Sequence, residues 1–149
     1  MSEPQLADLP AVVARARAEG NFALIVDALP YFRFLGLRVR NDGQLLTTIL
    51  PYDSKHMGRV NPSSFHGGVI AALLEAAAVL QLMAGDTAHV AETISITTDF
   101  LRAAASPTEL YAMASVTRQG RRVANVRIEA WQKDRHKLIA VANGNFLLT

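Results

Sequence analysis

The sequence predicts an α+β fold in which one antiparallel sheet wraps around a central apolar helix. Three observations lead to this prediction. Residues 67–83 are predicted to form a long interior helix that is apolar on every side apart from Glu75 and Gln81. A hairpin precedes this helix, and four long strands follow it. A helix without a polar face has to be surrounded by protein, and an enclosing sheet can cover it.

The length of 149 residues suits one domain with its own hydrophobic core. We expect a single domain over residues 1–149, with residues 1–30 as an N-terminal helical segment. Half of the residues are apolar and 19% are charged, which is typical of a globular protein and not of a disordered one. The net charge of +2 is weak, so nucleic-acid binding is not expected.

No cysteine is present, which excludes disulfides, cysteine metal sites and thiol nucleophiles. The first residues lack the basic and apolar regions of a secretory signal. The longest apolar stretch, residues 69–84, contains Glu75 and Gln81 and is too short for a comfortable membrane span. We therefore expect a cytoplasmic protein that does not bind a membrane and that works without a metal or an organic cofactor.

The N-terminal segment has a helical pattern. Apolar residues recur at helical spacing over residues 5–19, and Gly20 ends this helix. A second, shorter apolar segment covers residues 22–29 and stops at Pro30.

Residues 35–40 and 44–50 are strand candidates, and the Asn41-Asp42-Gly43 segment between them is a hairpin signal. Residues 51–65 contain prolines, glycine and several polar residues, which predicts a loop.

After the central helix the apolar period changes from helical to alternating. β-branched and aromatic residues alternate with others in four segments, namely residues 89–101, 109–119, 122–133 and 138–148. Turn residues lie between the segments, as at Gly120 and at Ser106-Pro107. Because the strands are long and consecutive, we expect an antiparallel meander.

Glu75 is the most informative residue of the central helix. Its apolar neighbours cannot solvate a carboxylate, and burying a carboxylate without a partner is costly. Glu75 therefore either forms a structural salt bridge or hydrogen bond, or faces a cavity or a subunit interface. Perturbed carboxylates gather at functional sites.

His66-Gly67-Gly68 lies at the start of the same helix, nine residues before Glu75. Glycines allow close approach of a ligand, and the unpaired first amides of a helix can form an oxyanion hole. Two glycines can equally serve the packing of a helix start. About 13 Å of helix, at 1.5 Å per residue, separates these amides from Glu75. If both groups act on one carbonyl, a partner subunit has to supply one of them.

The segment FHGGVIAALLE, residues 65–75, resembles the signature of hotdog-fold thioesterases of the PaaI-like and 4-hydroxybenzoyl-CoA thioesterase type. In those families an HGG motif opens the central helix, and an Asp or Glu follows nine residues after the His. The resemblance extends from about Phe34 to the C-terminus and includes the motif Asp99-Phe100-Leu101-Arg102. It implies an acyl-CoA thioesterase that works as a homodimer or homotetramer.

The resemblance also implies catalytic roles for three residues. The Gly67 N–H would polarise the thioester carbonyl, and Glu75 would attack this carbonyl or activate water. Thr93 matches a Ser/Thr position that helps to hold the acid or the water.

Substrate contacts are implied for Asn61, His66 and Gly68. The family's polar residue six positions before the His is Val60 here, so Asn61 fills this role only if the loop is one residue shorter. We interpret His66 as mainly structural, because it ties the loop to the start of the helix.

Arg121 and Arg122 lie in a predicted turn, and two interpretations stay open. The turn is either a solvated hairpin with exposed arginines or, as the resemblance implies, a contact for CoA phosphates, which a guanidinium binds in bidentate fashion. We interpret Phe100, Tyr111 and Trp131 as core residues and not as substrate-stacking ones.

A non-catalytic module that binds an acyl-CoA is the alternative function, although a binder gains nothing from an acid at the carbonyl. A hotdog dehydratase would carry an Asp and a His about five residues apart, and we find no such pair.

Overall fold

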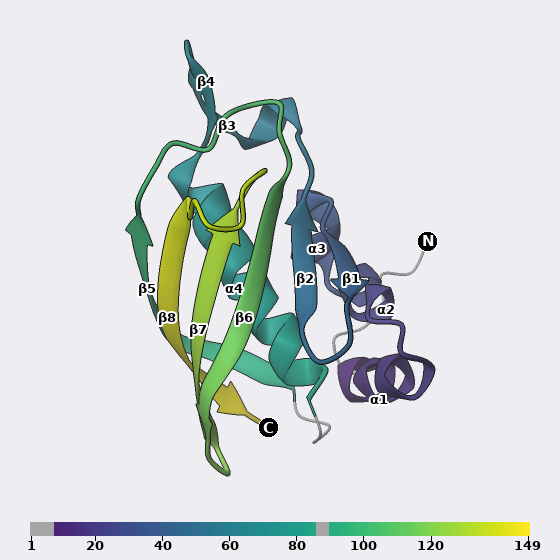
Figure 1. The fold of residues 1–149 in the computed structure, drawn as a ribbon. Helices are drawn as coiled ribbons and strands as arrows, with labels where there is room; N and C mark the ends of the chain where they lie inside the picture. Colours follow the sequence, from purple (N-terminus) through teal and green to yellow (C-terminus); the bar gives the residue numbers. More distant parts are fainter. Residues whose placement is uncertain (1–7, 86–89) are drawn as a thin grey trace.

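The computed structural model describes residues 8–85 and 90–149. The predicted starts of the first helix at residue 5 and of a strand at residue 89 lie outside these residues. The elements in chain order are α1 (Leu9–Glu19), α2 (Ala23–Ala28), α3 (Pro30–Leu35), β1 (Arg38–Asn41), β2 (Leu46–Leu50), the 3₁₀ helix η2 (Ser54–His56), β3 (Met57–Val60), β4 (Ser63–Phe65), α4 (Gly67–Met83), β5 (Ala91–Phe100), β6 (Leu110–Gln119), β7 (Val123–Trp131) and β8 (Ala140–Leu148) (Figure 1).

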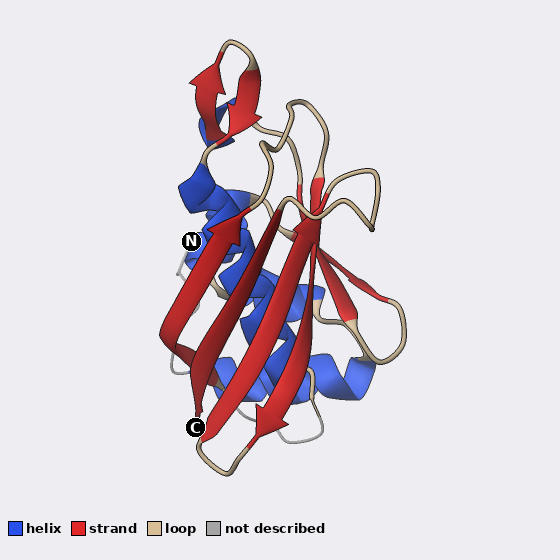
Figure 2. Ribbon diagram, turned by 60° about the vertical axis from the view of Figure 1, so that its left-hand side comes forward, coloured by secondary structure: helices blue, strands red, loops and turns tan. Residues whose placement is uncertain are grey.

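Six strands form one antiparallel sheet in the order β1-β2-β6-β7-β8-β5. The sheet curves around α4, and the helices lie on one of its faces (Figure 2). Many side chains of the sheet that face α4 are small and fully buried, among them Ala112, Ala114, Ala124 and Ala130. Because alanine leaves little bulk above a sheet, α4 contacts β2, β5, β6, β7 and β8. The predicted fold class, a sheet around a central apolar helix, is confirmed.

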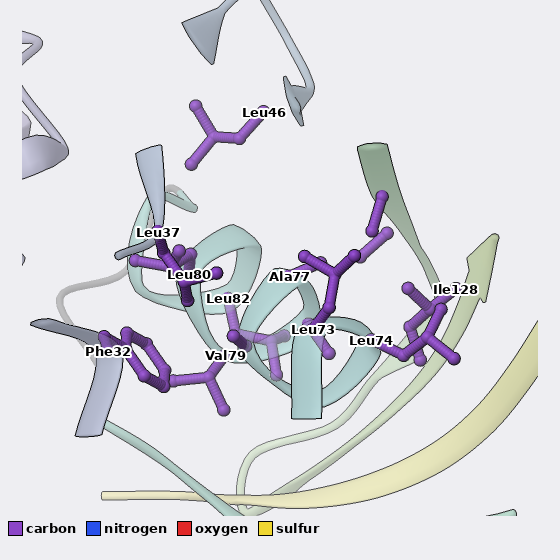
Figure 3. Close-up of a cluster of buried hydrophobic side chains, with 14 of the residues drawn as sticks. Phe32, Leu37, Leu46, Leu73, Leu74, Ala77, Val79, Leu80, Leu82 and Ile128 are labelled. Carbon is purple, nitrogen blue, oxygen red and sulfur yellow. The ribbon is translucent and has the colours of Figure 1, made fainter. Parts of the chain in front are cut away.

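The central helix begins and ends at the predicted residues. Its leucines, including Leu73, Leu74 and Leu80, are fully buried and pack against side chains such as Ile128 of β7 (Figure 3). Burial of one such side chain contributes about 1.5–3 kcal/mol. The core therefore fixes the axial position of α4 under the sheet.

Gly20 ends α1 in the left-handed conformation, with φ of 64°, as its position in the sequence predicted. The prediction that the helical segment stops at Pro30 misses α3, which Pro30 begins. Proline fits this position because the first residue of a helix needs no amide donor. Buried residues of α1, α2 and α3 share one core with α4.

The predicted β1–β2 hairpin is present, and Gly43 in its turn has φ of 108°. The predicted loop over residues 51–65 is wrong in part, since it contains η2 and the β3–β4 hairpin. This hairpin projects beyond the end of the sheet (Figure 2).

The predicted meander holds for β6, β7 and β8 and is wrong for β5, which pairs with β8 at the edge of the sheet. The segment after β5 crosses the end of the sheet to reach β6. It is held there by the β4 strand, since the Phe65 N–H donates to the Ala104 carbonyl at 3.0 Å and Ser64 bridges to Ala105. The strand that pairs with β6 on the side away from β7 is β2, where the meander predicted β5.

Candidate active site

The start of α4 is capped by His66. Its ring Nδ1 accepts a hydrogen bond from the Gly68 N–H at 2.8 Å, and its own N–H donates to the His56 carbonyl at 2.8 Å. A Cβ on Gly68 would lie 2.9 Å from this ring nitrogen, so the cap requires glycine there. The structure thus places His66 and Gly68 in the helix cap. The Gly68 amide already donates to the His66 ring.

The Gly67 amide differs from that of Gly68. As the first residue of α4 it has no acceptor within the helix, and no acceptor for it is found in the part of the chain that the structure describes. The ring of Phe100 lies against Gly67, 3.4 Å from where a Cβ would stand. Phe100 is 54% exposed, so the interpretation of Phe100 as a core residue is wrong. Gly67 therefore offers a free donor beside an aromatic wall.

One face of α4 is not covered by its own chain. Gly68, Ala71, Ala72 and Glu75 follow one another at helical spacing, and none of them is buried. We call these four residues the open face of α4. The expectation that protein surrounds this helix on every side is therefore wrong for a single chain.

Glu75 and Thr93 line the same cavity, which has a volume of about 560 Å³. Glu75 is the last residue of the open face, at the end away from Gly67, and it is half-buried. Its carboxylate has no hydrogen-bond or ion-pair partner among the residues that the structure describes. A structural salt bridge therefore does not account for this acid, whereas the other open interpretation, an acid that faces a cavity, describes its position.

Thr93 is positioned by a β-bulge in β5. Thr93 pairs with Phe146 of β8, and the register shifts before the next pair, Ser95 with Asn145. The residue left between them, Ile94, is 57% exposed, and the strand bends sharply in this region (Figure 1). Bulges re-aim side chains next to functional sites. Here the bulge directly follows Thr93, which lines the cavity, whereas the residues of β5 after the bulge do not line it.

Gly67 and Glu75 are not brought together within one chain. They are eight positions apart on α4, which is about 12 Å along the axis. Gly67 is also absent from the lining of the cavity that holds Glu75.

Asn61 lies in the turn of the β3–β4 hairpin, where it is exposed. Its neighbour Val60 is 91% exposed. Neither residue lines the cavity of Glu75 and Thr93. Within a single chain, the structure does not bring Asn61 to the predicted catalytic residues.

Arg121 and Arg122 are exposed in the turn between β6 and β7. The Arg122 carbonyl accepts a hydrogen bond from the Leu148 N–H at 2.7 Å. The next residue, Thr149, lines the cavity of Glu75. This turn therefore lies at the same end of the sheet as one wall of the cavity.

Trp131 and Tyr111 stack on the outer side of the sheet, with ring centroids 6.0 Å apart. Trp131 is buried, and the guanidinium carbon of Arg135 lies 4.1 Å from the centre of its ring. These two aromatic residues do not line the cavity of Glu75.

Sequence reasoning missed His56, which is buried in the segment predicted as a loop. The residue is 2% exposed, and the centre of its ring lies 6.4 Å from that of Phe65. Nδ1 is 3.3 Å from the Pro51 carbonyl oxygen, while the buried Nε2 has no partner among the described residues. Burial lowers the pKa of His56 below its ordinary value of 6.5. Since the His56 carbonyl also accepts the His66 N–H, this residue supports the start of α4.

The His56 ring predicts a pH-dependent stability. The folded chain favours the neutral imidazole, whereas the unfolded chain takes up a proton near pH 6.5. Stability is therefore complete above this pH and decreases as the pH falls below it, by at most about 1.4 kcal/mol per pH unit for one proton. We expect urea midpoints measured from pH 7.5 to 5 to fall, and His56→Gln to remove most of this slope.

The matched control is His136→Gln, because His136 is exposed and its removal should leave the slope unchanged. Asp53, whose pKa is lowered by a hydrogen bond from the Lys55 N–H, titrates below this window. Equal slopes for the parent and for His56→Gln would contradict the assignment.

No group of three or more side chains suited to hold a metal ion was found among residues 8–85 and 90–149. None of the helices in those residues is long and apolar enough to cross a membrane.

Comparison with known proteins gives a family and several structural neighbours. The model of the thioesterase superfamily matches residues 63–139. A solved structure of a protein from Chromobacterium violaceum is 38% identical and superposes with a TM-score of 0.74, and the match covers 92% of this chain and 96% of that one. Comparison with curated proteins gave no match.

Two neighbours with named functions are more distant. The PaaI protein from the phenylacetic acid degradation operon of E. coli is 21% identical, with a TM-score of 0.75 and coverage of 89% of this chain and 94% of that one. A thioesterase from Haemophilus influenzae is also 21% identical, with a TM-score of 0.70 and coverage of 80% and 82%. At this identity the likeness concerns the fold.

Proposed function

This chain belongs to the thioesterase superfamily and has the hotdog fold, so its class of activity is thioester hydrolysis, and we propose that its substrate is an acyl-CoA. One observation carries the proposal. Glu75 presents a carboxylate, without a partner among the described residues, to a cavity that Thr93 also lines. Water and the thioester yield a carboxylic acid and CoA, and this reaction needs a group that attacks the carbonyl or deprotonates water.

Each residue has a role in this proposal. The Gly67 N–H donates to the carbonyl oxygen, where negative charge develops as the carbonyl carbon becomes tetrahedral. Glu75 either takes a proton from the attacking water, or attacks this carbon itself to form a mixed anhydride, which water then hydrolyses to release the acid and restore the carboxylate. The C–S bond breaks, the sulfur leaves as the CoA thiolate and takes up a proton, and the acyl group keeps the oxygen from water. Thr93 helps to hold the carboxylate or the water.

We propose a dimer that joins two chains through their β5 strands. Its support is the edge position of β5, whose second side is unpaired in the described sheet. Ile94, Phe100 and Leu101, all more than half exposed, add apolar surface to this edge. The open face of α4 lies beside it, where small residues allow close approach.

This dimer brings the two separated groups together. In an antiparallel pair of β5 strands, the Phe100 end of one chain lies opposite the Ala91 end of its partner. Phe100 contacts Gly67, and Thr93 shares a cavity with Glu75. The Gly67 amide of one chain therefore approaches Glu75 of the other. This arrangement is needed because α4 holds the two groups of one chain about 12 Å apart.

A turnover assay tests the proposed function. The protein is offered a panel of acyl-CoAs, and release of the free thiol is measured. Hydrolysis above the background rate supports a thioesterase. Binding without turnover of any member would favour the alternative, a hotdog module that binds an acyl-CoA without cleaving it.

Arg121 and Arg122 are proposed to contact the CoA phosphates. Replacing both with Ala is expected to raise KM for an acyl-CoA by about three- to thirtyfold with little change in kcat, because exposed charge pairs contribute modestly and these groups are remote from the carbonyl. Salt screens such pairs, so the parent's KM should also rise with ionic strength more than the variant's does.

The comparison uses the same acyl group on CoA and on a truncated thiol that lacks the nucleotide. The control variant Arg15→Ala/Arg33→Ala removes the same charge from exposed positions elsewhere. If the Arg121 and Arg122 changes affect both thioesters equally, these arginines do not read the phosphates and the turn is a solvated hairpin.

A further inference from the structure

The cavity beside Glu75 extends along α4, whose lining residues beyond Glu75 are apolar. We call this apolar part of the cavity the channel. Glu75, Val79 and Met83 line the cavity at intervals of four residues, which places them in one row along the helix. The row begins at the carboxylate and runs away from the Gly67 end. Only the first residue of the row is polar, so the reacting carbonyl and an apolar tail would find different surroundings in one cavity.

The opposite wall comes from the N-terminal helices. Leu9 and Pro10 of α1, Leu29, and Phe32 of α3 line the cavity, and all four precede the matched region of the superfamily, residues 63–139. Phe32 and Val79 point toward one another (Figure 3). One wall of this cavity is therefore formed by residues 9–35, which we call the N-terminal layer and which lie outside the region that the superfamily shares.

We infer that the acyl group is an unbranched aliphatic chain of medium length that lies between α4 and the N-terminal layer. This inference rests on the proposed function and names its substrate class. Among the lining residues that the structure describes, Glu92 and Thr149, at the β5 and β8 wall, are the polar ones besides Glu75 and Thr93. A hydroxylated aromatic acyl group would find few donors or acceptors, and a second carboxylate on the acyl group would meet the charges of Glu75 and Glu92.

The row on α4 sets the length of the chain. Met83 is eight positions beyond Glu75, a distance of about 12 Å along the helix. A C–C bond is about 1.5 Å long, and an extended carbon chain advances slightly less than this per carbon. About eight to ten carbons therefore fit along the row. A volume of about 560 Å³ accommodates such a chain.

A series of saturated acyl-CoAs with two to sixteen carbons tests the inference. Each buried methylene contributes about 0.8 kcal/mol, so kcat/KM should rise about fourfold per added carbon and stop rising near eight to ten carbons. Benzoyl-CoA and 4-hydroxybenzoyl-CoA should be poorer substrates than octanoyl-CoA.

Val79→Phe fills the channel one helical turn beyond Glu75 and should move the break in the series to about four carbons. Val79→Ala is the matched control at the same position, and it should not shorten the preferred chain. Activity of Val79→Phe with acetyl-CoA shows that the variant is folded and that its catalytic groups are intact.

Affinity for non-hydrolysable acyl-CoA thioethers of the same lengths gives a second readout, independent of turnover. If no acyl-CoA is hydrolysed but affinity still rises with chain length and Val79→Phe shortens the preferred chain, the proposed hydrolysis fails and this inference stands. If both kcat/KM and affinity are insensitive to chain length, or if Val79→Phe leaves the profile unchanged, the acyl chain does not occupy this channel.

Discussion

Replacing Glu75 with Gln is expected to lower kcat for acyl-CoA hydrolysis by about 10²–10⁴-fold, the usual cost of losing a positioned general base. The amide keeps the size of the side chain but can neither attack the carbonyl nor accept a proton from water. Because the Glu75 carboxylate makes no ion pair with a described residue, the exchange breaks no structural bridge. We therefore expect an unchanged thermal unfolding midpoint and an affinity for CoA close to that of the parent.

Glu92→Gln is the matched control, because Glu92 is a second carboxylate that lines the same cavity. It lies on β5, outside the row that α4 presents, and its exchange should leave kcat within a few-fold of the parent. Retention of most activity by Glu75→Gln would make Glu75 a structural acid, and the reaction would then need a different base.

Local features of the sequence were sufficient to predict the helices and strands that carry their own signals. His66 and the glycines after it mark the start of α4, and Gly20 ends α1 because glycine adopts a positive φ without strain. These positions depend on contacts within a few residues. The resemblance to hotdog thioesterases adds the activity class, and the superfamily match supports it.

The neighbours of β5 could not be predicted in the same way. Alternation of apolar residues indicates that a segment is a strand but not which strand it pairs with. The pairing of β5 with β8, and of β2 with β6, joins segments that are distant in the sequence. The contacts that hold the segment after β5 at the end of the sheet, between Phe65 and Ala104 and between Ser64 and Ala105, are equally distant.

The surroundings of Glu75 also depend on tertiary structure. An apolar helix looks enclosed in the sequence, yet the open face of α4 is not covered by the described part of its own chain, because the sheet ends at the edge strand β5. Phe32, which lines the cavity of Glu75, belongs to a helix that the proline at its start concealed. His56 gave no signal, since a lone histidine among polar residues looks like an exposed one.

Mixing two inactive variants is expected to restore activity if each active site combines Gly67 of one chain with Glu75 of the other. Gly67→Pro removes the amide donor, and proline suits the first position of a helix. The backbone of His66, with φ of −65° and ψ of 135°, already has the extended conformation that a following proline requires. Loss of one oxyanion-hole donor costs about 10²–10³-fold in kcat.

Gly67→Pro and Glu75→Gln are each expected to be nearly inactive, and Gly67→Ala is the control that keeps the amide. After the two variants are unfolded together and refolded, about half of the dimers contain one chain of each. Such a dimer has one site with both functional groups and one site with neither, so about a quarter of the parent's activity should return.

Light scattering before and after mixing should give the mass of an oligomer and not the 16.2 kDa of one chain. A mixed preparation that is oligomeric but as inactive as its components would show that Gly67 and Glu75 do not act across the subunit boundary. A single chain would then have to bend or shift to bring together two groups that its helix holds about 12 Å apart.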